Sequence, residues 1–262
     1  MKLLLLRKVI HRIPVNGVTK FFIKYIRSFL KVFYQNYVNI EIYGFLMSLR
    51  AKGNLSEKRL LLSPQFFDHS ERMWIKTFIK NDDVFFDVGC NIGAYSLWVA
   101  SLSRSIRIES FEPDPDMIRR FTETVTRNHL NNITLNQYAI GSKNNVGILK
   151  INQTNRGENF ISNETSFPNA CTVKIKKLSS VIVNKGYTKI SLLKIDTEGN
   201  ELEALQAFFD ESKESLWPES IICERKKEHQ KCDSFFDNYG YELSLTTRMN
   251  GIYIRKNNVI SK

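Results

Sequence analysis

Residues 84–93 read VFFDVGCNIG, an apolar run that contains one acid and is followed by two glycines four positions apart. An apolar run of this length is typical of a buried strand, and the residues after Gly93 have the composition of a helix. Glycine permits a sharp turn from strand to helix, and it leaves room for a ligand that lies across the helix N-terminus. The stretch therefore predicts a strand–turn–helix unit that binds a nucleoside-like cofactor.

The spacing within this turn distinguishes between two cofactors. A dinucleotide-binding fold has three glycines in the order GxGxxG and places its acid at the end of the second strand. Here the turn reads Asp87-x-Gly89-x-Asn91-x-Gly93, with an acid on the first strand. This pattern favours S-adenosylmethionine, and these four residues are the predicted cofactor-binding turn.

A second strand is expected over 106–111, and it ends at Glu112. A carboxylate in this place can accept hydrogen bonds from both ribose hydroxyls of a nucleoside. The residues 113–115 then open a helix that we expect to reach about Asn128. A glycine-containing strand end alone would also fit an ordinary strand–helix turn, and the spaced Glu112 argues against that simpler interpretation.

The rest of the chain predicts an α/β fold with a doubly wound sheet. Strands alternate with helices, a rhythm that is typical of a mostly parallel sheet. The expected strands lie near 84–88, 106–111, 133–138, 189–195 and 219–224, and the expected helices near 41–52, 70–80, 93–102, 114–128 and 199–210. A terminal hairpin is expected at 241–247 and 250–256, turning at 249–251, because Asn-Gly is a strong turn signal.

One stretch, between about 143 and 180, breaks this rhythm. Two β-like runs, 146–151 and 171–176, flank a polar loop over 152–170. Loops of this length are usually functional or disordered. Because the stretch follows the third strand, beside the place where such sheets bind ligands, we expect a hairpin insertion that covers the cofactor or shapes the acceptor site. Surface decoration is the alternative.

The positive charge is concentrated at the N-terminus. Of the net charge of +11, residues 1–40 supply +8 and contain no acid. At 100° per residue, two sets of side chains lie on opposite faces of one helix: the cations Lys20, Lys24, Arg27 and Lys31, and the apolar residues Phe22, Ile26, Phe29 and Phe33. A basic amphipathic helix of this kind fits the surface of an anionic membrane. A helix that packs its Phe face on the body is an equal alternative.

Cysteine usage and the N-terminal residues indicate the compartment. The four cysteines show no CxxC pairing and the four histidines are scattered, so neither a disulfide framework nor a zinc site is expected. The leucine run 3–6 is interrupted by Arg7 and Lys8, and no cleavage site follows. No stretch approaches the roughly 20 apolar residues of a transmembrane helix. We expect a cytoplasmic protein, peripheral at the inner membrane face if the N-terminal helix binds lipid.

The segment 192–203, LLKIDTEGNELE, ends the fourth strand with Asp196 and then starts a helix. The carboxyl edge of that strand borders the ligand site in a doubly wound sheet. Glu201 and Glu203 are explained by the helix dipole, which favours acids in the first turn. Asp196 and Glu198 precede the helix, so they are candidates for a direct role in the site.

Four motifs together resemble the FkbM family of S-adenosylmethionine-dependent methyltransferases: the Asp-x-Gly-x-Asn-x-Gly turn, Phe-Glu-Pro at 111–113, Tyr-Ala-Ile-Gly at 138–141, and Lys-Ile-Asp-Thr-Glu-Gly-Asn-Glu at 194–201. The similarity runs from about Asp68 to Arg255. It implies a class I, Rossmann-like methyltransferase fold with seven strands and an antiparallel C-terminal hairpin. It also adds Ala139 to the cofactor-binding residues. We divide the chain into a basic helical arm, 1–67, and a methyltransferase domain, 68–262.

The resemblance implies O-methylation of a hydroxyl on a sugar, glycan or secondary metabolite. Such a transfer needs the acceptor oxygen in line with the methyl–sulfur bond, and the hydroxyl must lose a proton. We predict that Asp196 and Glu198 bind the acceptor and act in catalysis, with Glu224 at the end of the fifth strand as the second choice. His229 is a further candidate base, although a solvated helix start explains it better.

Two other functions remain as alternatives. An RNA methyltransferase would explain the basic composition, but the positive charge lies in the arm, and the carboxylates that end the fourth strand would repel phosphate. Nucleic acid is therefore not an expected partner. A non-catalytic protein that binds the cofactor is the second alternative, and the complete set of Asp87, Gly89, Gly93 and Glu112 argues against it. No metal site is predicted.

Overall fold

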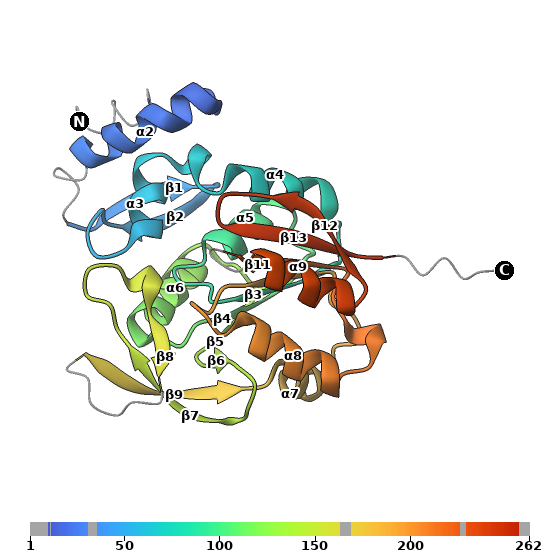
Figure 1. The fold of residues 1–262 in the computed structure, drawn as a ribbon. Coiled ribbons are helices and arrows are strands. Elements are labelled where there is room, and N and C mark those ends of the chain that lie inside the picture. The colour runs from blue at the N-terminus through green and yellow to red at the C-terminus, as the bar shows by residue number, and fades with distance from the viewer. Residues whose placement is uncertain (1–9, 11, 31–35, 163–168, 226–228, 257–262) are drawn as a thin grey trace.

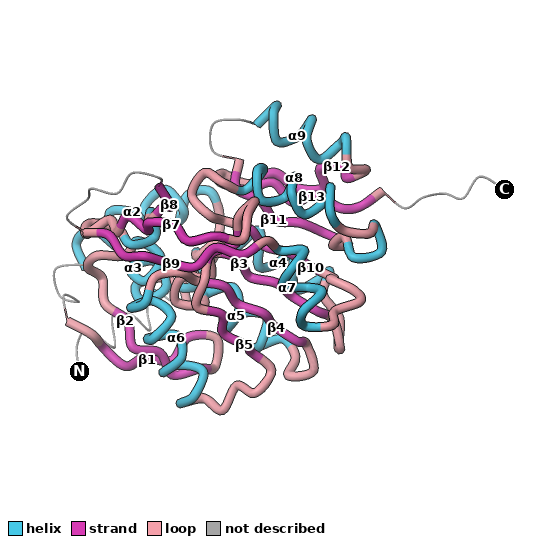
Figure 2. Tube along the Cα trace, turned by 90° about the horizontal axis from the view of Figure 1, so that it is seen from below, coloured by secondary structure: helices cyan, strands magenta, loops and turns pink. Residues whose placement is uncertain are grey.

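The computed structural model has a seven-stranded sheet at its centre (Figures 1 and 2). The residues that the structure describes are 10, 12–30, 36–162, 169–225 and 229–256. The strands are β3 (Val84–Val88), β4 (Arg107–Phe111), β5 (Ile133–Asn136), β10 (Leu192–Ile195), β11 (Ser220–Glu224), β12 (Tyr241–Thr246) and β13 (Asn250–Arg255). They lie in the order β12-β13-β11-β10-β3-β4-β5. Only β13 runs antiparallel to both of its neighbours, which confirms the predicted doubly wound sheet with a C-terminal hairpin.

Helices cover both faces of this sheet. They are α4 (His69–Phe78), α5 (Ala94–Leu102), α6 (Pro115–Arg127), α7 (Leu178–Lys185), α8 (Glu201–Glu211), α9 (His229–Asn238) and the single turn η4 (Glu214–Leu216). Phe85 and Phe86 are neighbours in β3 and both fully buried, yet they belong to different hydrophobic clusters. Because successive strand residues point to opposite faces, Phe85 packs with α4–α6 and Phe86 with α7–α9. Helix α7 is one that the sequence did not predict.

The helix predicted over 41–52 is wrong, because this stretch forms a β-hairpin. Its strands are β1 (Val38–Ile42) and β2 (Phe45–Leu49), and they pair antiparallel. Tyr43 and Gly44 make the turn, both with positive φ. Ile40 and Ile42 are buried while Glu41 between them is exposed, a period of two that fits a strand and not a helix.

The remaining N-terminal elements pack on this hairpin. They are α2 (Gly17–Leu30), α3 (Leu55–Leu62) and the single turn η2 (Pro64–Phe66). Ile40, Met47 and Leu60 lie in the same buried cluster as Phe85 of the central sheet, so the N-terminal elements share a core with the sheet. Figure 1 shows α2 as the outermost of these elements. Among the described helices, none combines the length and the apolar character that crossing a membrane requires. The domain division at residue 67 stays a prediction.

The insertion forms a second, four-stranded sheet in the order β6-β9-β7-β8. Its elements are β6 (Ala139–Ile140), β7 (Asn145–Lys150), η3 (Arg156–Glu158), β8 (Phe160–Ser162) and β9 (Ala170–Lys176). β7 and β9 are the two strands of the predicted hairpin. The polar stretch 152–170 is more ordered than predicted, because it contains η3 and β8, while residues 163–168 lie outside the described part of the chain.

The C-terminal hairpin turns earlier than predicted. The turn lies at 247–249, where the Thr247 amide donates to the Asn250 carbonyl at 2.9 Å. Gly251 is already paired in β13. A Cβ there would lie 2.7 Å from Arg225 and 2.8 Å from Tyr253. This glycine is therefore needed for side-chain packing, and the Asn-Gly pair does not form the turn.

Candidate active site

A cavity lies at the carboxyl edge of β3, β4 and β10. The order of the sheet reverses at β3, since β4 lies on one side of it and β10 on the other. Doubly wound sheets bind their ligands at this switch point. The lining comes from 67–68, 89–92, 112–113, 139–140, 156–161 and 196–200, among other residues. The core, the insertion and the N-terminal segment thus all contribute to the cavity.

The two glycines of the turn after β3 are required by the protein's own packing. Gly89 has a φ of +71°, and a Cβ there would lie 1.8 Å from the carbonyl oxygen of Asp196 in the neighbouring β10 edge. Gly93 has a φ of +81°, and a Cβ would lie 2.1 Å from the ring of Phe121. The predicted reason for both glycines was room for a ligand. This reason is wrong, because protein atoms already occupy the position of the Cβ at Gly89 and at Gly93.

Four of the six predicted cofactor-binding residues line the cavity: Gly89, Asn91, Glu112 and Ala139. Asp87 does not, because it is fully buried beneath the turn. Its carboxylate accepts hydrogen bonds from the amide of Ser96 at 3.1 Å and from the Ser96 hydroxyl at 2.6 Å. Gly93 lies behind the cavity at the start of α5. Both residues therefore hold the turn in place, and the prediction that they bind the cofactor stays a prediction.

Glu112 is the carboxylate for which ribose binding is predicted. It ends β4 and is 7% exposed. Its Oε2 accepts the Asn91 amide at 2.8 Å and its Oε1 accepts the Asp114 amide at 2.9 Å. Each carboxylate oxygen can accept a further hydrogen bond. Burial raises the pKa of Glu112 to about 7, against the effect of the two amides, so its charge changes near neutral pH.

A buried lysine, which the sequence analysis did not single out, links the two strands that border the cavity. Lys194 is 6% exposed. Its Nζ lies 3.3 Å from Asp196 Oδ2 and 3.9 Å from Asp87 Oδ1, and it donates to the Gly89 carbonyl at 3.1 Å. Burial alone would lower the pKa of Lys194, but the carboxylates of Asp196 and Asp87 raise it above its ordinary value. The signal in the sequence was a cation within the apolar strand, because buried lysines are nearly always paired.

The loop that follows β10 carries the predicted catalytic residues. Asp196 and Glu198 both line the cavity, and the side chain of Asp196 is 34% exposed. Glu198 has a φ of +58°, a conformation that costs a non-glycine residue about 1 kcal/mol and is often found at functional sites. Glu201 holds this loop, since its carboxylate accepts the amides of Thr197 at 2.6 Å and of Gly199 at 3.1 Å. The helix dipole alone therefore did not explain Glu201.

Glu224 ends β11 beside this loop. One carboxylate oxygen each of Asp196, Glu201 and Glu224 lies within 4.8 Å of the others. Three carboxylates so close could hold a divalent cation, although Glu201 is already engaged by backbone amides. The prediction of no metal site stays a prediction. Glu224 does not line the described cavity, and the side chain of His229 lies outside the described part of the structure.

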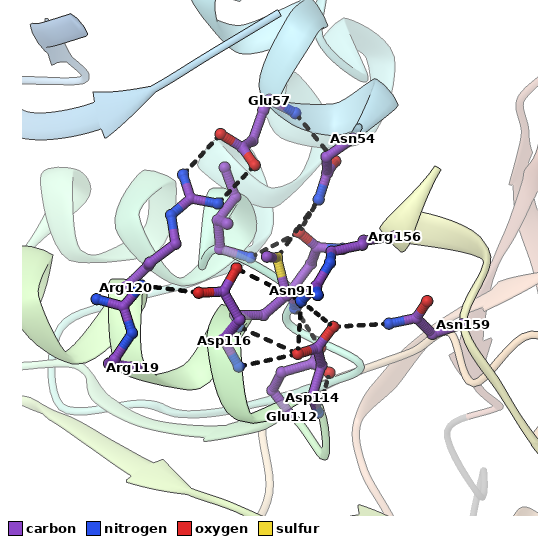
Figure 3. Close-up of polar contacts among 12 residues, drawn as sticks. Asn54, Glu57, Asn91, Glu112, Asp114, Asp116, Arg119, Arg120, Arg156 and Asn159 are labelled. Carbon is purple, nitrogen blue, oxygen red and sulfur yellow. Dashed lines mark hydrogen bonds and ion pairs between the residues drawn. The ribbon is translucent and has the colours of Figure 1, made fainter. Parts of the chain in front are cut away.

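The insertion is fastened over the cavity by a polar cluster (Figure 3). Arg156 of η3 donates to both carboxylate oxygens of Asp114 at 3.0 Å, and Asn159 donates to Asp114 at 2.8 Å. The N-terminal segment joins the same cluster, because Asn54 donates to the side-chain oxygen of Asn91 at 2.8 Å. The insertion therefore lines the site and does not merely decorate the surface. The sequence located this stretch but did not indicate Arg156 or Asn159.

The thiol of Cys90 also lines the cavity. Burial raises its pKa well above the ordinary value, and the neighbouring carboxylates of Asp87 and Glu112 add to this effect. A thiol that stays protonated is a poor nucleophile. Cys90 therefore contributes shape to the cavity and not covalent chemistry.

The sheet order and the cavity at its switch point define a class I methyltransferase. A family model described as the methyltransferase FkbM domain matches residues 87–243, and the chain belongs to this family. This membership confirms the predicted family and establishes S-adenosylmethionine as the cofactor.

One curated relative and two solved structures illustrate the similarity. The hexuronic acid methyltransferase AglP of Haloferax volcanii is 29% identical over 127 residues. The alignment covers 48% of this chain and 50% of that protein, so the match spans about half of the relative's length.

The methyltransferase domain of METTL16 has a TM-score of 0.51 at 12% identity and covers 82% of this chain and 74% of that one. The precorrin-6y C5,15-methyltransferase of Geobacter metallireducens has a TM-score of 0.48 at 13% identity and covers 80% of this chain and 100% of that one. At such identities, the METTL16 likeness is evidence for the fold alone.

Proposed function

We propose that this methyltransferase transfers its methyl group to a hydroxyl of a sugar, a glycan or a hydroxylated secondary metabolite. The observation that carries the proposal is the position of Asp196. Its partly exposed carboxylate ends β10, lines the cavity and lies beside the turn after β3. A carboxylate there can take the proton of an acceptor hydroxyl.

The residues of the cavity fit S-adenosylmethionine. The cavity lies at the switch point of the sheet, where such folds bind a nucleotide, and Glu112 follows β4, where it would accept the ribose hydroxyls. When bound, the cofactor supplies an electrophilic methyl group on a sulfonium cation. The acids around the cavity, Asp68, Glu112, Asp196 and Glu198, favour such a positive charge.

Each residue near β10 then has a role in the transfer. Asp196 accepts the proton of the acceptor hydroxyl, and Lys194 holds that carboxylate in one position. Glu198 hydrogen-bonds a second hydroxyl of the acceptor, because its backbone conformation presents it at the cavity. Glu224 is the reserve candidate base. Positioning of the acceptor oxygen supplies most of the acceleration, because a methyl transfer needs an aligned attack.

The charge of the site favours a neutral acceptor. Arg156 is a cation in the cavity lining, and Asp114 and Asp116 already neutralise it. A carboxylate or phosphate at the edge of β10 would meet Asp196 and Glu198 without a free cation in the described lining. The relative AglP is named for a hexuronic acid, so its name supports a sugar acceptor but not a neutral one. We favour the hydroxyl of a neutral sugar over an acidic sugar or RNA.

We also propose that the protein works in the cytoplasm. None of the four cysteines, which all lie in the described part of the chain, forms a disulfide. Cysteines outside disulfides are typical of reducing compartments. A thiol-specific reagent that labels Cys171 in intact cells only after the cytoplasmic membrane is permeabilised would support this location.

The test is methyl transfer from labelled S-adenosylmethionine to a panel of neutral sugars, hexuronic acids and RNA oligonucleotides. We expect turnover on a neutral sugar, and we expect Asp196→Asn to lower that turnover by at least about 100-fold. S-adenosylhomocysteine should still bind this variant within about threefold. The matched control is Asp237→Asn, which removes an exposed carboxylate paired with Lys256 and should leave turnover unchanged.

Transfer that survives Asp196→Asn would exclude this residue as the base and would direct attention to Glu224. Transfer confined to RNA would overturn the acceptor class. Cofactor binding without turnover on any acceptor would favour the non-catalytic alternative.

A further inference from the structure

Helix α2 presents an apolar face to solvent. Five of its residues are large, apolar and between 54% and 68% exposed: Val18, Phe21, Phe22, Tyr25 and Phe29. At 100° per residue these side chains fall within one arc of about 100° on the helix surface. Single exposed apolar residues are ordinary, but a contiguous patch on a protein surface marks an interaction site.

A second face of α2 packs on the body. Ile23 and Leu30 are buried, and Ile26 packs against the same cluster. Arg27 donates to the hydroxyl of Ser63 at 2.5 Å, and burial lowers the pKa of this guanidinium to about 10. The helix is therefore held in one orientation, and the side chains of its aromatic arc are exposed to solvent.

This arrangement differs from the alternative in which the helix packs its Phe face on the body. The helix does pack on the body, but Ile23 and Leu30 make that contact, whereas Phe22 and Phe29 are exposed. Lys31 and Phe33 lie outside the described residues. Two separate apolar stripes on one helix require two partners, and within the described residues the body supplies one of them.

The charge around the arc indicates the second partner. Lys24 is exposed on the flank of the arc, and its Nζ lies 4.6 Å from the ring centroid of Phe21 and 4.8 Å from that of Tyr25. Lys20 is also exposed and lies farther round the helix, about 100° from Phe21. Residues 1–40 carry +8 and no acid. A second copy of the chain would bring like charges together at this face, whereas an anionic surface would neutralise them.

We propose that the aromatic arc of α2 binds the surface of an anionic phospholipid membrane, with the helix lying in the interface. Aromatic and aliphatic side chains then enter the boundary between headgroups and acyl chains. Lys24 on the flank of the arc, and Lys20 farther round the helix, attract the lipid phosphates. This proposal does not depend on the acceptor. It places the cavity near a membrane, where a lipid-linked glycan would be an accessible substrate.

The test is co-sedimentation of the full chain with vesicles of phosphatidylcholine alone or of phosphatidylcholine mixed equally with phosphatidylglycerol. We expect binding to the mixed vesicles only, weaker as salt is raised. Phe22→Ser with Phe29→Ser should lower the partition coefficient by roughly tenfold or more. Lys20→Glu with Lys24→Glu should also lower it by roughly tenfold or more.

Two matched controls separate this face from general effects. Val146→Ser with Val183→Ser removes two other apolar side chains, 62% and 69% exposed. Lys143→Glu with Lys174→Glu makes the same change of net charge at two exposed lysines of the insertion region. Both controls should bind the mixed vesicles as the unchanged chain does, and all variants should bind S-adenosylhomocysteine equally. All the side chains changed in these four variants are exposed, so the folding of the variants should be unaffected.

Equal vesicle binding by the aromatic variant and the unchanged chain would overturn the proposal. A chain that does not bind the mixed vesicles and forms a dimer that Phe22→Ser with Phe29→Ser dissociates would also overturn it, in favour of a contact between copies.

Discussion

The two halves of the cavity are built in different ways. The half at the edge of β3, β4 and β10 consists of strand ends whose polar groups are buried and paired, as Lys194 is with Asp87 and Asp196. The other half comes from the N-terminal segment and the insertion, where Arg156 and Phe160 are partly exposed. We call these the sheet half and the attached half of the cavity: buried pairs fix the sheet half, while the attached half has partly exposed side chains. Substitutions in the first half should therefore cost more stability.

The largest expected effect is that of Gly89→Ala. The new Cβ would meet the Asp196 carbonyl oxygen at 1.8 Å while the residue keeps a positive φ, and the clash and the strain together should lower the free energy of unfolding by about 4 kcal/mol. Gly186→Ala is the matched control. Its φ is +69° with no atom within 4 Å of the new Cβ, so only strain of about 1 kcal/mol applies. Urea denaturation measures both, and equal costs would contradict the close approach of the two strands.

Lys194→Met should lower the free energy of unfolding by about 3 kcal/mol, because it leaves the buried Asp87 without its cation. Adding Asp87→Asn should recover part of this loss. Lys189→Met is the control, since Lys189 is 54% exposed and its surface pair with Glu219 contributes little. If the two lysine variants unfold at the same urea concentration, the buried pairing does not stabilise this half.

Arg156→Met tests the fastening of the insertion. The buried carboxylate of Asp114 would lose its cation but keep Asn159, so we expect a smaller loss of about 1.5 kcal/mol. S-adenosylhomocysteine should dissociate roughly fivefold faster in stopped-flow measurements. Arg119→Met, at a 59% exposed arginine of the neighbouring helix, should change neither quantity. An unchanged dissociation rate for Arg156→Met would mean that the insertion does not cover the cofactor.

Glu198→Gly should have the smallest effect on stability and the opposite sign. It releases the strain of a positive φ and should raise the free energy of unfolding by about 1 kcal/mol, while methyl transfer falls because the acceptor loses a hydrogen bond. Glu198→Gln keeps the strain, so it should lower transfer without stabilising the chain. Denaturation and transfer assays on both variants separate conformation from chemistry. A destabilised Glu198→Gly would show that the backbone is not strained.

The sequence predicted the fold of the sheet half well, because the sequence signals for this half are local. The apolar runs predict the strands, the two glycines predict the turn, and Glu112 marks the end of a strand. Each of these signals comes from residues close together in the sequence. What it did not predict are contacts between residues far apart in the chain, such as Lys194 with Asp87. The burial of Asp87 and the protein packing around Gly89 belong to the same class, since both depend on the neighbouring strand or helix.

The attached half was predicted less well, and here short apolar stretches were a second source of error besides long-range contacts. A helix was predicted where the β1–β2 hairpin lies, because a short apolar stretch fits both the helical period of 3.6 residues and the strand period of 2 residues. Only the turn distinguishes the two. Tyr43-Gly44 is not one of the usual turn pairs, so its conformation could not be inferred from composition. The insertion was located by its broken rhythm, but its folding over the cavity rests on Arg156 and Asn159 binding Asp114, a pairing that sequence spacing does not indicate.

The central claim is that this cavity binds the cofactor through Glu112. Its most direct test is calorimetric titration with S-adenosylhomocysteine at pH 8 and pH 6. The pKa of Glu112 is raised to about 7, and the ionised carboxylate is the form that accepts both ribose hydroxyls. Affinity should therefore be full above this pKa and fall by roughly tenfold at pH 6. Glu112→Gln should bind at least tenfold more weakly and lose the pH dependence. Binding by the unchanged protein that is equal at both pH values, and equal in Glu112→Gln, would contradict the account.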